Sequence, residues 1–288
     1  MTSGIRDSAP AKVNLCLYLG PTRDDGRHEL VTVFQPIGLA DTVELTPAGL
    51  GAAADRVVCP GVEGENLATV ALRRFRERTG WTGSPVRLTI EKRIPVAAGM
   101  AGGSADAGAA LRLAARAAGI SDDNLLREIA AGLGADVAAQ VRPRRYLATG
   151  AGERLTPLPA PTPYGVLVLP SNDKLATADV YREADRQGLP RSPEDLAARL
   201  REVSTAAADL PDRLIANDLE SAARALCPSI DEALLAARGV GARHALVCGS
   251  GPTVIGLFHD IQAARGAAAR LTDRDPRPFA VAPWGATL

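Results

Sequence analysis

Three glycines lie close together in the segment from Pro95 to Asp106. Gly99, Gly102 and Gly103 allow the backbone to adopt positive φ and to approach a ligand without a Cβ in the way. Such a turn suits phosphate, because its free N–H groups can donate to phosphate oxygens. The segment is neither a Walker A loop, which needs Gly-Lys-Ser/Thr, nor a Gly-x-Gly-x-x-Gly fingerprint. An ordinary turn between a strand and a helix remains the alternative.

The elements that flank this segment would aim it at an anion. Before it, Val86, Leu88 and Ile90 alternate with polar residues, which predicts a half-buried strand. After it, an Ala-rich stretch predicts a helix that Ser104 caps, that carries Asp106 in its first turn and that ends near residue 119. A strand, a glycine turn and a helix start in this order direct N–H groups and the positive end of the helix dipole at a ligand.

The composition is that of an ordinary soluble protein with a small ligand. The chain has 288 residues, of which 46% are hydrophobic and 23% charged, and this length is enough for two domains. The 33 basic and 33 acidic residues balance, so neither a nucleic acid nor a membrane surface is indicated as a partner. Four scattered cysteines predict reduced thiols in a cytoplasmic protein. We expect no signal peptide and no membrane span.

Lysine is rare in this chain. Only three of the 33 basic residues are lysines, namely Lys12, Lys92 and Lys174. Arginine stays charged in proteins whereas the pKa of lysine is tunable, so the lysines that remain are worth inspecting. The alternative is chance, which we accept for Lys174 because it stands in a polar loop. Lys12 and Asn14 share one face of a strand predicted from Ala11 to Leu19. The alternative for Lys12 is an exposed strand lysine.

The rest of the pattern predicts an α+β protein in two halves. The first half would contain strands at 31–35 and 42–46, an irregular segment at 47–64, a helix at 65–78 and a further helix capped by Ser121. The Pro-rich residues 157–163 suggest a boundary, with domains at 1–157 and 158–288. The second half would contain strands at 166–169, 245–248, 254–258 and 279–283, a helix capped by Ser192 and a helix at 261–271.

Six segments in chain order resemble the GHMP small-molecule kinases. They are Pro-Ala-Lys-Val-Asn-Leu at 10–15, Asp-Gly-Arg-His-Glu-Leu at 25–30, Lys-Arg-Ile-Pro at 92–95 with the glycine segment, Gly-Ala-Asp-Val at 134–137, Asn-Asp-Leu-Glu at 217–220 and Gly-Ser-Gly-Pro-Thr-Val at 249–254. Each is weak alone, but their order spans nearly the whole chain. The resemblance implies a two-domain kinase with an N-terminal ATP-binding domain, a C-terminal α/β sandwich domain, and ATP with Mg²⁺ as cofactors.

The resemblance implies that Lys12 and Asp136 are catalytic. Asp136 would orient or deprotonate the attacking hydroxyl, as phosphoryl transfer requires. Lys12 would keep Asp136 ionised and offset the charge that grows on the transferred phosphoryl group. Taken alone, Asp136 is also explained as the N-cap of a helix that follows Gly134.

The resemblance also assigns the binding residues. Asn14 and His28 would hydrogen-bond the substrate and Tyr181 would stack on cytosine, although a loop histidine and a core aromatic remain the alternatives for the last two. The turn at 249–253 would approach the ligand phosphates, or is a plain hairpin turn. Ser104 would contact Mg²⁺ or a phosphate oxygen. The expected ATP contacts are Pro95, Val96, Ala97, Ala98, Gly99, Met100, Ala101, Gly102, Gly103, Ser104 and Ala105, with Asn66 and Lys92 at the adenine.

The implied reaction is ATP-dependent phosphorylation of the 2-hydroxyl of a polyol carried on cytidine diphosphate, in isoprenoid precursor biosynthesis. The family pattern has an aromatic where this chain has Arg27, a proline and aromatics at 138–140, and a serine at Ala105. Arg27 is expected among the substrate-binding residues, because arginine can stack on a base and pair with a phosphate; the alternative is that the cytidine contact is lost. These departures leave two alternatives, a paralogous kinase for another alcohol and a non-catalytic nucleotide-binding protein. The partner would be a small molecule, and the chain a monomer or a weak homodimer.

Overall fold

The computed structural model describes residues 4–96, 98–206 and 208–286, and this part of the chain forms two compact units. The first unit takes residues 4–11, 39–96 and 101–143. The second takes residues 12–38, 98–100, 144–206 and 208–286. The strands β1 (Ile5–Thr22) and β2 (His28–Pro47) contribute to both units, because the division falls within each of them. Strands and helices are mixed in both units, which confirms the predicted α+β class.

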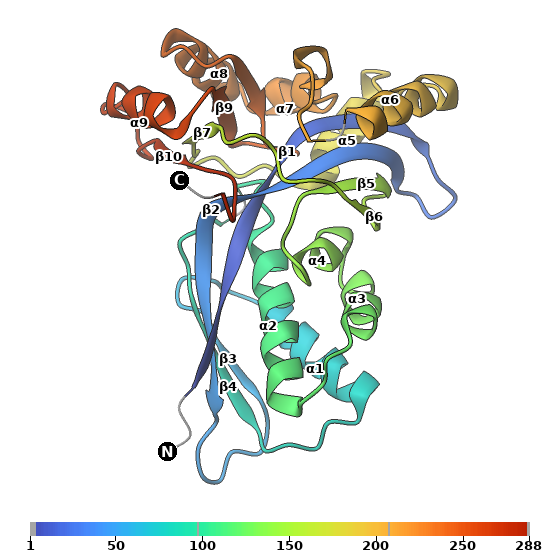
Figure 1. Ribbon diagram of the computed structural model, residues 1–288, viewed down its shortest axis with the longest axis vertical. Helices are drawn as coiled ribbons and strands as arrows, with labels where there is room; N and C mark the ends of the chain where they lie inside the picture. The colour runs from blue at the N-terminus through green and yellow to red at the C-terminus, as the bar shows by residue number, and fades with distance from the viewer. Residues whose placement is uncertain (1–3, 97, 207, 287–288) are drawn as a thin grey trace. The chain divides into compact units, whose positions relative to one another are not determined.

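The first unit contains strands from one edge of the six-stranded sheet, together with four helices (Figure 1). Residues 42–47 of β2 pair antiparallel with β4 (Val86–Glu91), and β3 (Arg56–Val58) runs parallel to β4. The helices α1 (Leu67–Thr79), α2 (Gly102–Ala118), α3 (Asp123–Ala131) and α4 (Ala135–Gln140) pack on one another. The Ala-rich α2 is buried along most of its length, because its small side chains let α1 and α4 approach closely.

The second unit is organised around a four-stranded antiparallel sheet. Its order is β10 (Phe279–Val281), β7 (Gly165–Leu169), β9 (Val254–Phe258) and β8 (His244–Val247), and α8 (Ser229–Gly239) and α9 (Ile261–Ala269) contact these strands. Residues 30–34 of β2 pair with β5 (Tyr146–Gly150), which pairs with β6 (Arg154–Pro157). The remaining helices are α5 (Thr177–Arg186), α6 (Pro193–Thr205), the 3-10 helix η1 (Asp212–Leu214) and α7 (Glu220–Leu226).

The structure corrects the prediction of two strands at 31–35 and 42–46, because they are parts of the single strand β2. Pro36 and Gly38 resemble breakers in the sequence, yet the backbone between the two segments stays extended. The N–H of Gly38 donates to the carbonyl of Ala282 at 2.8 Å, and Ile37 forms a bridge with Pro283. The segment 47–64 is also less irregular than expected, since it contains β3.

Two predicted helix caps are wrong. The helix α2 begins after Ala101, a non-glycine residue at φ 56°, and Ser104 lies inside its first turn. Asp106 therefore lies beyond the first turn. The helix α3 is capped by Asp122, whose carboxylate accepts from the N–H groups of Asn124 and Leu125, and not by Ser121. The predicted Ser192 cap of α6 is confirmed.

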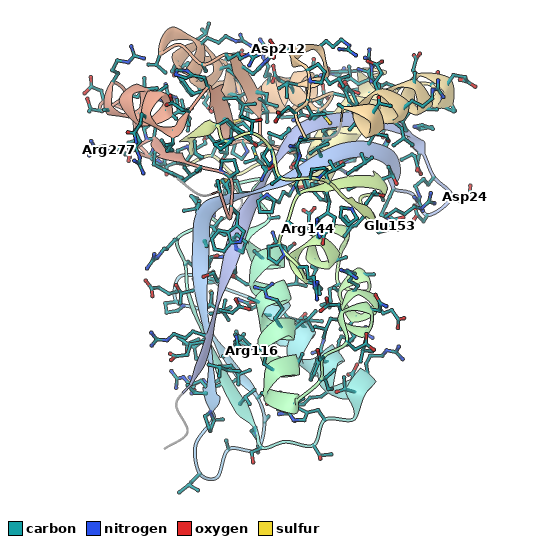
Figure 2. All side chains as sticks on the ribbon, in the orientation of Figure 1. Asp24, Arg116, Arg144, Glu153, Asp212 and Arg277 are labelled. Atoms are coloured by element: carbon teal, nitrogen blue, oxygen red, sulfur yellow. The ribbon has the colours of Figure 1, made fainter. Side chains whose placement is uncertain are left out.

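Charged side chains mostly project outward, as Asp24 and Arg277 do in Figure 2. All four cysteines are free thiols, in agreement with the prediction of reduced thiols. No helix in the described part of the chain is long and apolar enough to cross a membrane.

Candidate active site

The start of α2 offers backbone donors to an anion. The first helical hydrogen bond runs from the N–H of Ala105 to the carbonyl of Ala101, so the N–H groups of residues 102–104 precede it. These groups lie at the positive end of a 17-residue helix. A Cβ at Gly103 would meet no atom within 4 Å, which leaves this turn open to a ligand. This geometry supports the predicted phosphate contact.

Residues 98–100 of the glycine segment belong to the second unit. Gly99 has φ 73°, and a Cβ there would lie 2.5 Å from the carbonyl oxygen of Cys248. The carbonyl of Met100 accepts from the N–H of Lys12 at 3.1 Å. The turn that joins β8 to β9 is a hairpin turn, one of the two alternatives that the sequence left open. It also packs against the glycine segment, because a Cβ at Gly249 would lie 3.2 Å from the carbonyl oxygen of Gly99 and 4.0 Å from Nζ of Lys12. Ala97 lies outside the described residues.

Lys12 is a buried lysine, and the alternative of an exposed strand lysine is wrong. Its side chain is 7% exposed, and Nζ donates to Oδ1 of Asn14 at 2.9 Å. Nδ2 of Asn14 donates to Oγ1 of Thr32 at 2.7 Å, and this hydroxyl donates to the carbonyl of Cys16 at 2.6 Å. The ring of Phe34 lies 4.8 Å from Nζ. The position of the ammonium is therefore set by a chain of buried hydrogen bonds that spacing alone did not reveal.

Asp136 lies in the first turn of α4, in the first unit. The helix N-cap is Gly134, so the N-cap alternative for Asp136 is wrong. The other end of α4 is firmly held: Nε2 of Gln140 donates to the carbonyl of Pro10 at 3.0 Å, and Arg112 donates to the carbonyl of Gln140. A Cβ at Gly108 of α2 would lie 2.6 Å from that same carbonyl oxygen, so glycine is what lets α4 approach α2.

Residues 138–140 depart from the family pattern, yet all three are buried in the structure. Gln140 links α4 to a residue that precedes Lys12 by two positions in the sequence. The contacts of Gln140 and Thr32 could not be predicted from the sequence, because a polar residue in a run gives no sign of which distant carbonyl or side chain it will bind.

Lys92 is held between two carboxylates. Nζ lies 2.5 Å from Oδ2 of Asp41 and 2.8 Å from Oδ2 of Asp106, and Oδ1 of Asp41 accepts from the N–H groups of Arg93 and Ile94. Burial raises the pKa of Asp106 to about 7, against the opposing effect of Lys92. A Cβ at Gly102 would lie 3.2 Å from Nζ of Lys92, so this cluster supports the start of α2. A contact of Lys92 with adenine stays a prediction.

Asn66 is the N-cap of α1, where its Oδ1 accepts from the N–H of Ala68 at 2.9 Å. Of the other predicted ATP contacts, Pro95 is half-buried and Val96 is exposed, whereas Ala98 and Ala105 are buried. Ala98 and Ala105 therefore pack in the protein interior, whereas Val96 faces solvent.

His28 and Tyr181 are brought together in the second unit, although 153 positions of sequence separate them. Their ring centroids lie 5.3 Å apart, and Nε2 of His28 lies 2.7 Å from Oδ1 of Asp185 on the same helix as Tyr181. His28 is buried and Tyr181 half-buried. Arg27, by contrast, is exposed and pairs with Asp25 at 2.7 Å. The roles of these residues toward a substrate stay predictions.

Two family models match the chain. The model described as GHMP kinases N terminal domain matches residues 66–143, and the model described as GHMP kinases C terminal matches residues 196–276. The chain belongs to the GHMP kinases, and it is an ATP-dependent small-molecule kinase, which confirms the resemblance seen in the sequence. Among the described residues, no three His, Cys, Asp or Glu side chains gather as a metal site.

The chain is also similar to individual kinases whose names are known. The chain is 40% identical to a 4-diphosphocytidyl-2-C-methyl-D-erythritol kinase of Anaeromyxobacter dehalogenans, over 92% of this chain and 84% of that protein. It is 40% identical to the kinase of the same name in Streptomyces coelicolor, over 97% of each. A crystal structure of 4-(cytidine 5'-diphospho)-2C-methyl-D-erythritol kinase matches 98% of this chain and 100% of its own, with a TM-score of 0.79 and 34% identity. A homoserine kinase from Cytophaga hutchinsonii, at 16% identity and a TM-score of 0.74, shares the fold.

Proposed function

We propose that this chain transfers the γ-phosphoryl group of ATP to the 2-hydroxyl of 4-(cytidine 5'-diphospho)-2-C-methyl-D-erythritol, a step in isoprenoid precursor biosynthesis. The observation that carries the proposal is the 40% identity to kinases of this name over up to 97% of the chain. Such a match includes both halves of the protein, so it takes in the residues for the nucleotide and those for the acceptor.

We assign the chemistry to Lys12 and Asp136. The Asp136 carboxylate accepts the proton of the substrate hydroxyl while the oxygen of that hydroxyl bonds to the γ-phosphorus of ATP. The bond between the γ-phosphorus and the oxygen that bridges it to the β-phosphate breaks at the same time, and ADP leaves. The Lys12 ammonium offsets the negative charge on the transferred group. A buried ammonium held by Asn14 supports this role, because a fixed charge needs little reorganisation when the reaction occurs.

The ATP phosphates would lie against the N–H groups at the start of α2. Three features favour them there: donors not used by the helix, the open space at Gly103 and the helix dipole. Mg²⁺ prefers oxygen ligands and is usually bound partly through phosphates. Ser104 carries the one side-chain hydroxyl in residues 98–105, so we propose it as the protein ligand. When bound, the ion would neutralise charge on the phosphates.

The acceptor would be recognised by the pair His28 and Tyr181 and by Asn14. An aromatic ring already packed beside a histidine presents a preformed face for a pyrimidine base, so little side-chain freedom is lost on binding. Asp185 fixes one ring nitrogen of His28 by its 2.7 Å contact, which leaves the other for the substrate.

Release of ADP in a coupled assay tests the proposal. We expect turnover with the cytidine-linked substrate and none above background with 2-C-methyl-D-erythritol alone. Background rates with the cytidine-linked substrate, in the presence of ATP and Mg²⁺, would reject the proposal.

One observation favours a second candidate, a GHMP kinase for another alcohol. Arg27 stands where the family pattern has an aromatic, and it is exposed and paired with Asp25. Turnover of homoserine or mevalonate exceeding that of the cytidine-linked substrate would support this candidate.

A further inference from the structure

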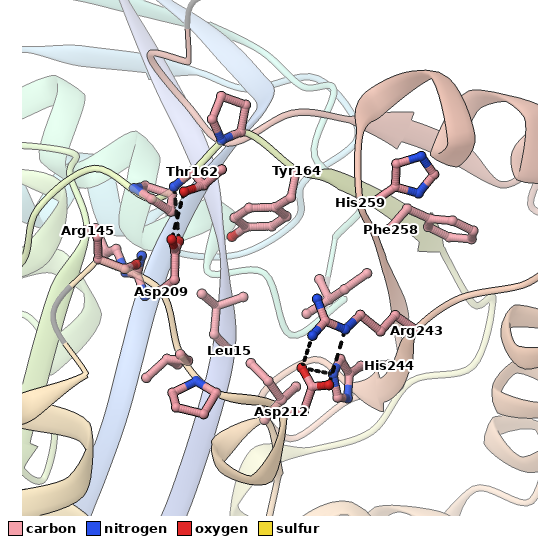
Figure 3. A pocket seen from close by; sticks show the side chains of 17 residues that line it. Leu15, Arg145, Thr162, Tyr164, Asp209, Asp212, Arg243, His244, Phe258 and His259 are labelled. Atoms are coloured by element: carbon pink, nitrogen blue, oxygen red, sulfur yellow. Dashed lines mark hydrogen bonds and ion pairs between the residues drawn. The ribbon is translucent and has the colours of Figure 1, made fainter.

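The second unit contains a cavity of about 450 Å³ that none of the residues proposed above lines. Its walls come from Leu15 of β1, from residues 161–164, from residues 208–212 and from the ends of β8 and β9 (Figure 3). A volume of this size is typical of small-molecule sites.

Arg145 lines one side of the cavity and is only 4% exposed. One of its nitrogens, Nη1, donates to the carbonyl of Ala208, whereas Nε and Nη2 have no hydrogen-bond partner in the described part of the chain. Burial lowers the pKa of Arg145 from its usual range, but arginine remains charged at neutral pH. A buried cation with two unused donors is costly unless something else accepts from them.

Tyr164 supplies a further unused donor beside Arg145. Its hydroxyl is buried without a hydrogen-bond partner among the described residues, and Figure 3 shows it directed toward Arg145 and Asp209. Burial raises the pKa of this phenol, so the group stays protonated and can donate. Three donor groups without a partner among the described residues therefore lie beside this end of the cavity, and their complement is an acceptor-only group, which is the character of an oxyanion.

The carboxylate of Asp209 is already occupied. It accepts from the N–H of Thr162 at 3.0 Å and from the Thr162 hydroxyl at 2.7 Å. Its negative charge near Arg145 disfavours a dianion such as phosphate, because a second negative charge would face it with no cation to balance it. A monoanion carries only one such charge, so Asp209 repels it less than it repels a dianion.

The rest of the lining decides what the anion is attached to. Between the two polar ends the walls are mainly apolar, and they include Leu15, Leu210, Ile215 and Leu257. At the far end, Arg243 pairs with Asp212 at 2.6 Å, and Asp212 also lies 3.1 Å from His244, so these charges are already balanced. The ligand would therefore be apolar beyond its anionic group.

We propose that this cavity binds a carboxylate on a short apolar chain. The two carboxylate oxygens match the parallel N–H groups of the Nε and Nη2 fork of Arg145. The hydroxyl of Tyr164 donates to one of the same oxygens, and the alkyl chain occupies the apolar walls.

Titration of the full-length protein with acetate, butyrate, hexanoate and inorganic phosphate, by ligand-observed NMR at constant ionic strength, tests the proposal. Butyrate should bind about tenfold more tightly than acetate, because two more methylenes are buried. Phosphate should not displace it. Equal affinities for acetate and butyrate, or displacement by phosphate, would overturn the proposal.

Three variants locate the site. Tyr164→Phe removes only the hydroxyl and should weaken butyrate binding by roughly five- to tenfold. Arg145→Gln should abolish binding, with circular dichroism as the check that it folds. Arg265→Gln is the matched control, since it removes an exposed arginine of α9 that does not line the cavity, and its affinity for butyrate should equal that of the wild type. Unchanged binding in Tyr164→Phe would place the ligand elsewhere and overturn the proposal, whatever the fold of Arg145→Gln. No ATP is present, so the result is independent of the proposed kinase reaction.

Discussion

Nζ of Lys12 donates to Oδ1 of Asn14 at 2.9 Å, and both side chains are buried in β1. Asn14 is fixed in turn by Thr32 on β2. A lysine held in this way loses little freedom when a phosphate binds, so its contribution should appear in the rate of the chemical step more than in affinity.

We expect Lys12→Met to lower kcat by roughly 100-fold or more while the Kd for ATP changes little, because the variant keeps the bulk of the side chain and removes only its charge. Steady-state kinetics and calorimetry with ATP measure the two quantities. Lys174→Met, at an exposed lysine, is the matched control and should retain full activity. Near-normal kcat in Lys12→Met would show that the assigned role is wrong.

Asp136→Asn should lower kcat by roughly 100- to 10,000-fold, since an amide cannot accept the hydroxyl proton. Affinity for ATP should stay within a few fold of the wild-type value. The control is Asp123→Asn, which also removes a carboxylate from the first turn of a helix in the same unit. Asp123→Asn should keep the wild-type rate. If Asp136→Asn did so too, another group would have to be the base.

The two glycines of the nucleotide segment should fail in different ways. In Gly99→Ala the new Cβ would meet the carbonyl oxygen of Cys248 at 2.5 Å in a positive-φ conformation, so we expect a loss of about 1–3 kcal/mol in the free energy of unfolding. Gly103→Ala meets no protein atom and should unfold like the wild type. Its KM for ATP should nevertheless rise, because the Cβ occupies the space proposed for phosphate. An unchanged KM would argue against phosphate binding at this turn.

Asp106 should make stability depend on pH. Its pKa is raised to about 7 by burial in the folded protein, against an ordinary value of about 3.9 in the unfolded chain. Between these values the folded state binds the proton more tightly, so the free energy of unfolding should fall as pH rises from about 4 to about 7, by roughly a few kcal/mol at most.

Urea unfolding across this pH range checks the Asp106 prediction. The difference in stability between wild type and Asp106→Asn should vary with pH, because the variant has no proton to lose at this position. Asp24→Asn, at an exposed residue, should run parallel to the wild type. A constant difference between wild type and Asp106→Asn would contradict the raised pKa.

Arg27→Tyr should tighten binding of the cytidine-linked substrate by roughly threefold if a base stacks near His28, because the variant replaces an exposed ion pair with an aromatic ring. Arg27→Gln removes the charge without adding a ring and separates the two effects. Binding of the nucleotide part alone can be followed with CDP. Weaker binding in both variants would mean that Arg27 itself contacts the ligand.

Local patterns in the sequence were enough to predict the half-buried strand at Val86, the Ala-rich helix that follows it and the Ser192 cap. Each of these depends on residues within a few positions of one another, and side-chain period and capping chemistry act at that range. The order of six short motifs was enough to indicate the kinase family, and a buried role for Lys12 was only suggested by the scarcity of lysine.

Tertiary structure alone decided the rest. It joined two predicted strands into β2, because partners far away in the chain keep residues 36–41 extended. It moved the α2 cap from Ser104 to Ala101 and placed Lys92 between Asp41 and Asp106. It also left Arg145 and Tyr164, at the wall of a cavity, with donors for which the described residues supply no acceptor. Hydrogen bonds and ion pairs between residues distant in sequence depend on how the chain closes on itself, and no local pattern records that closure.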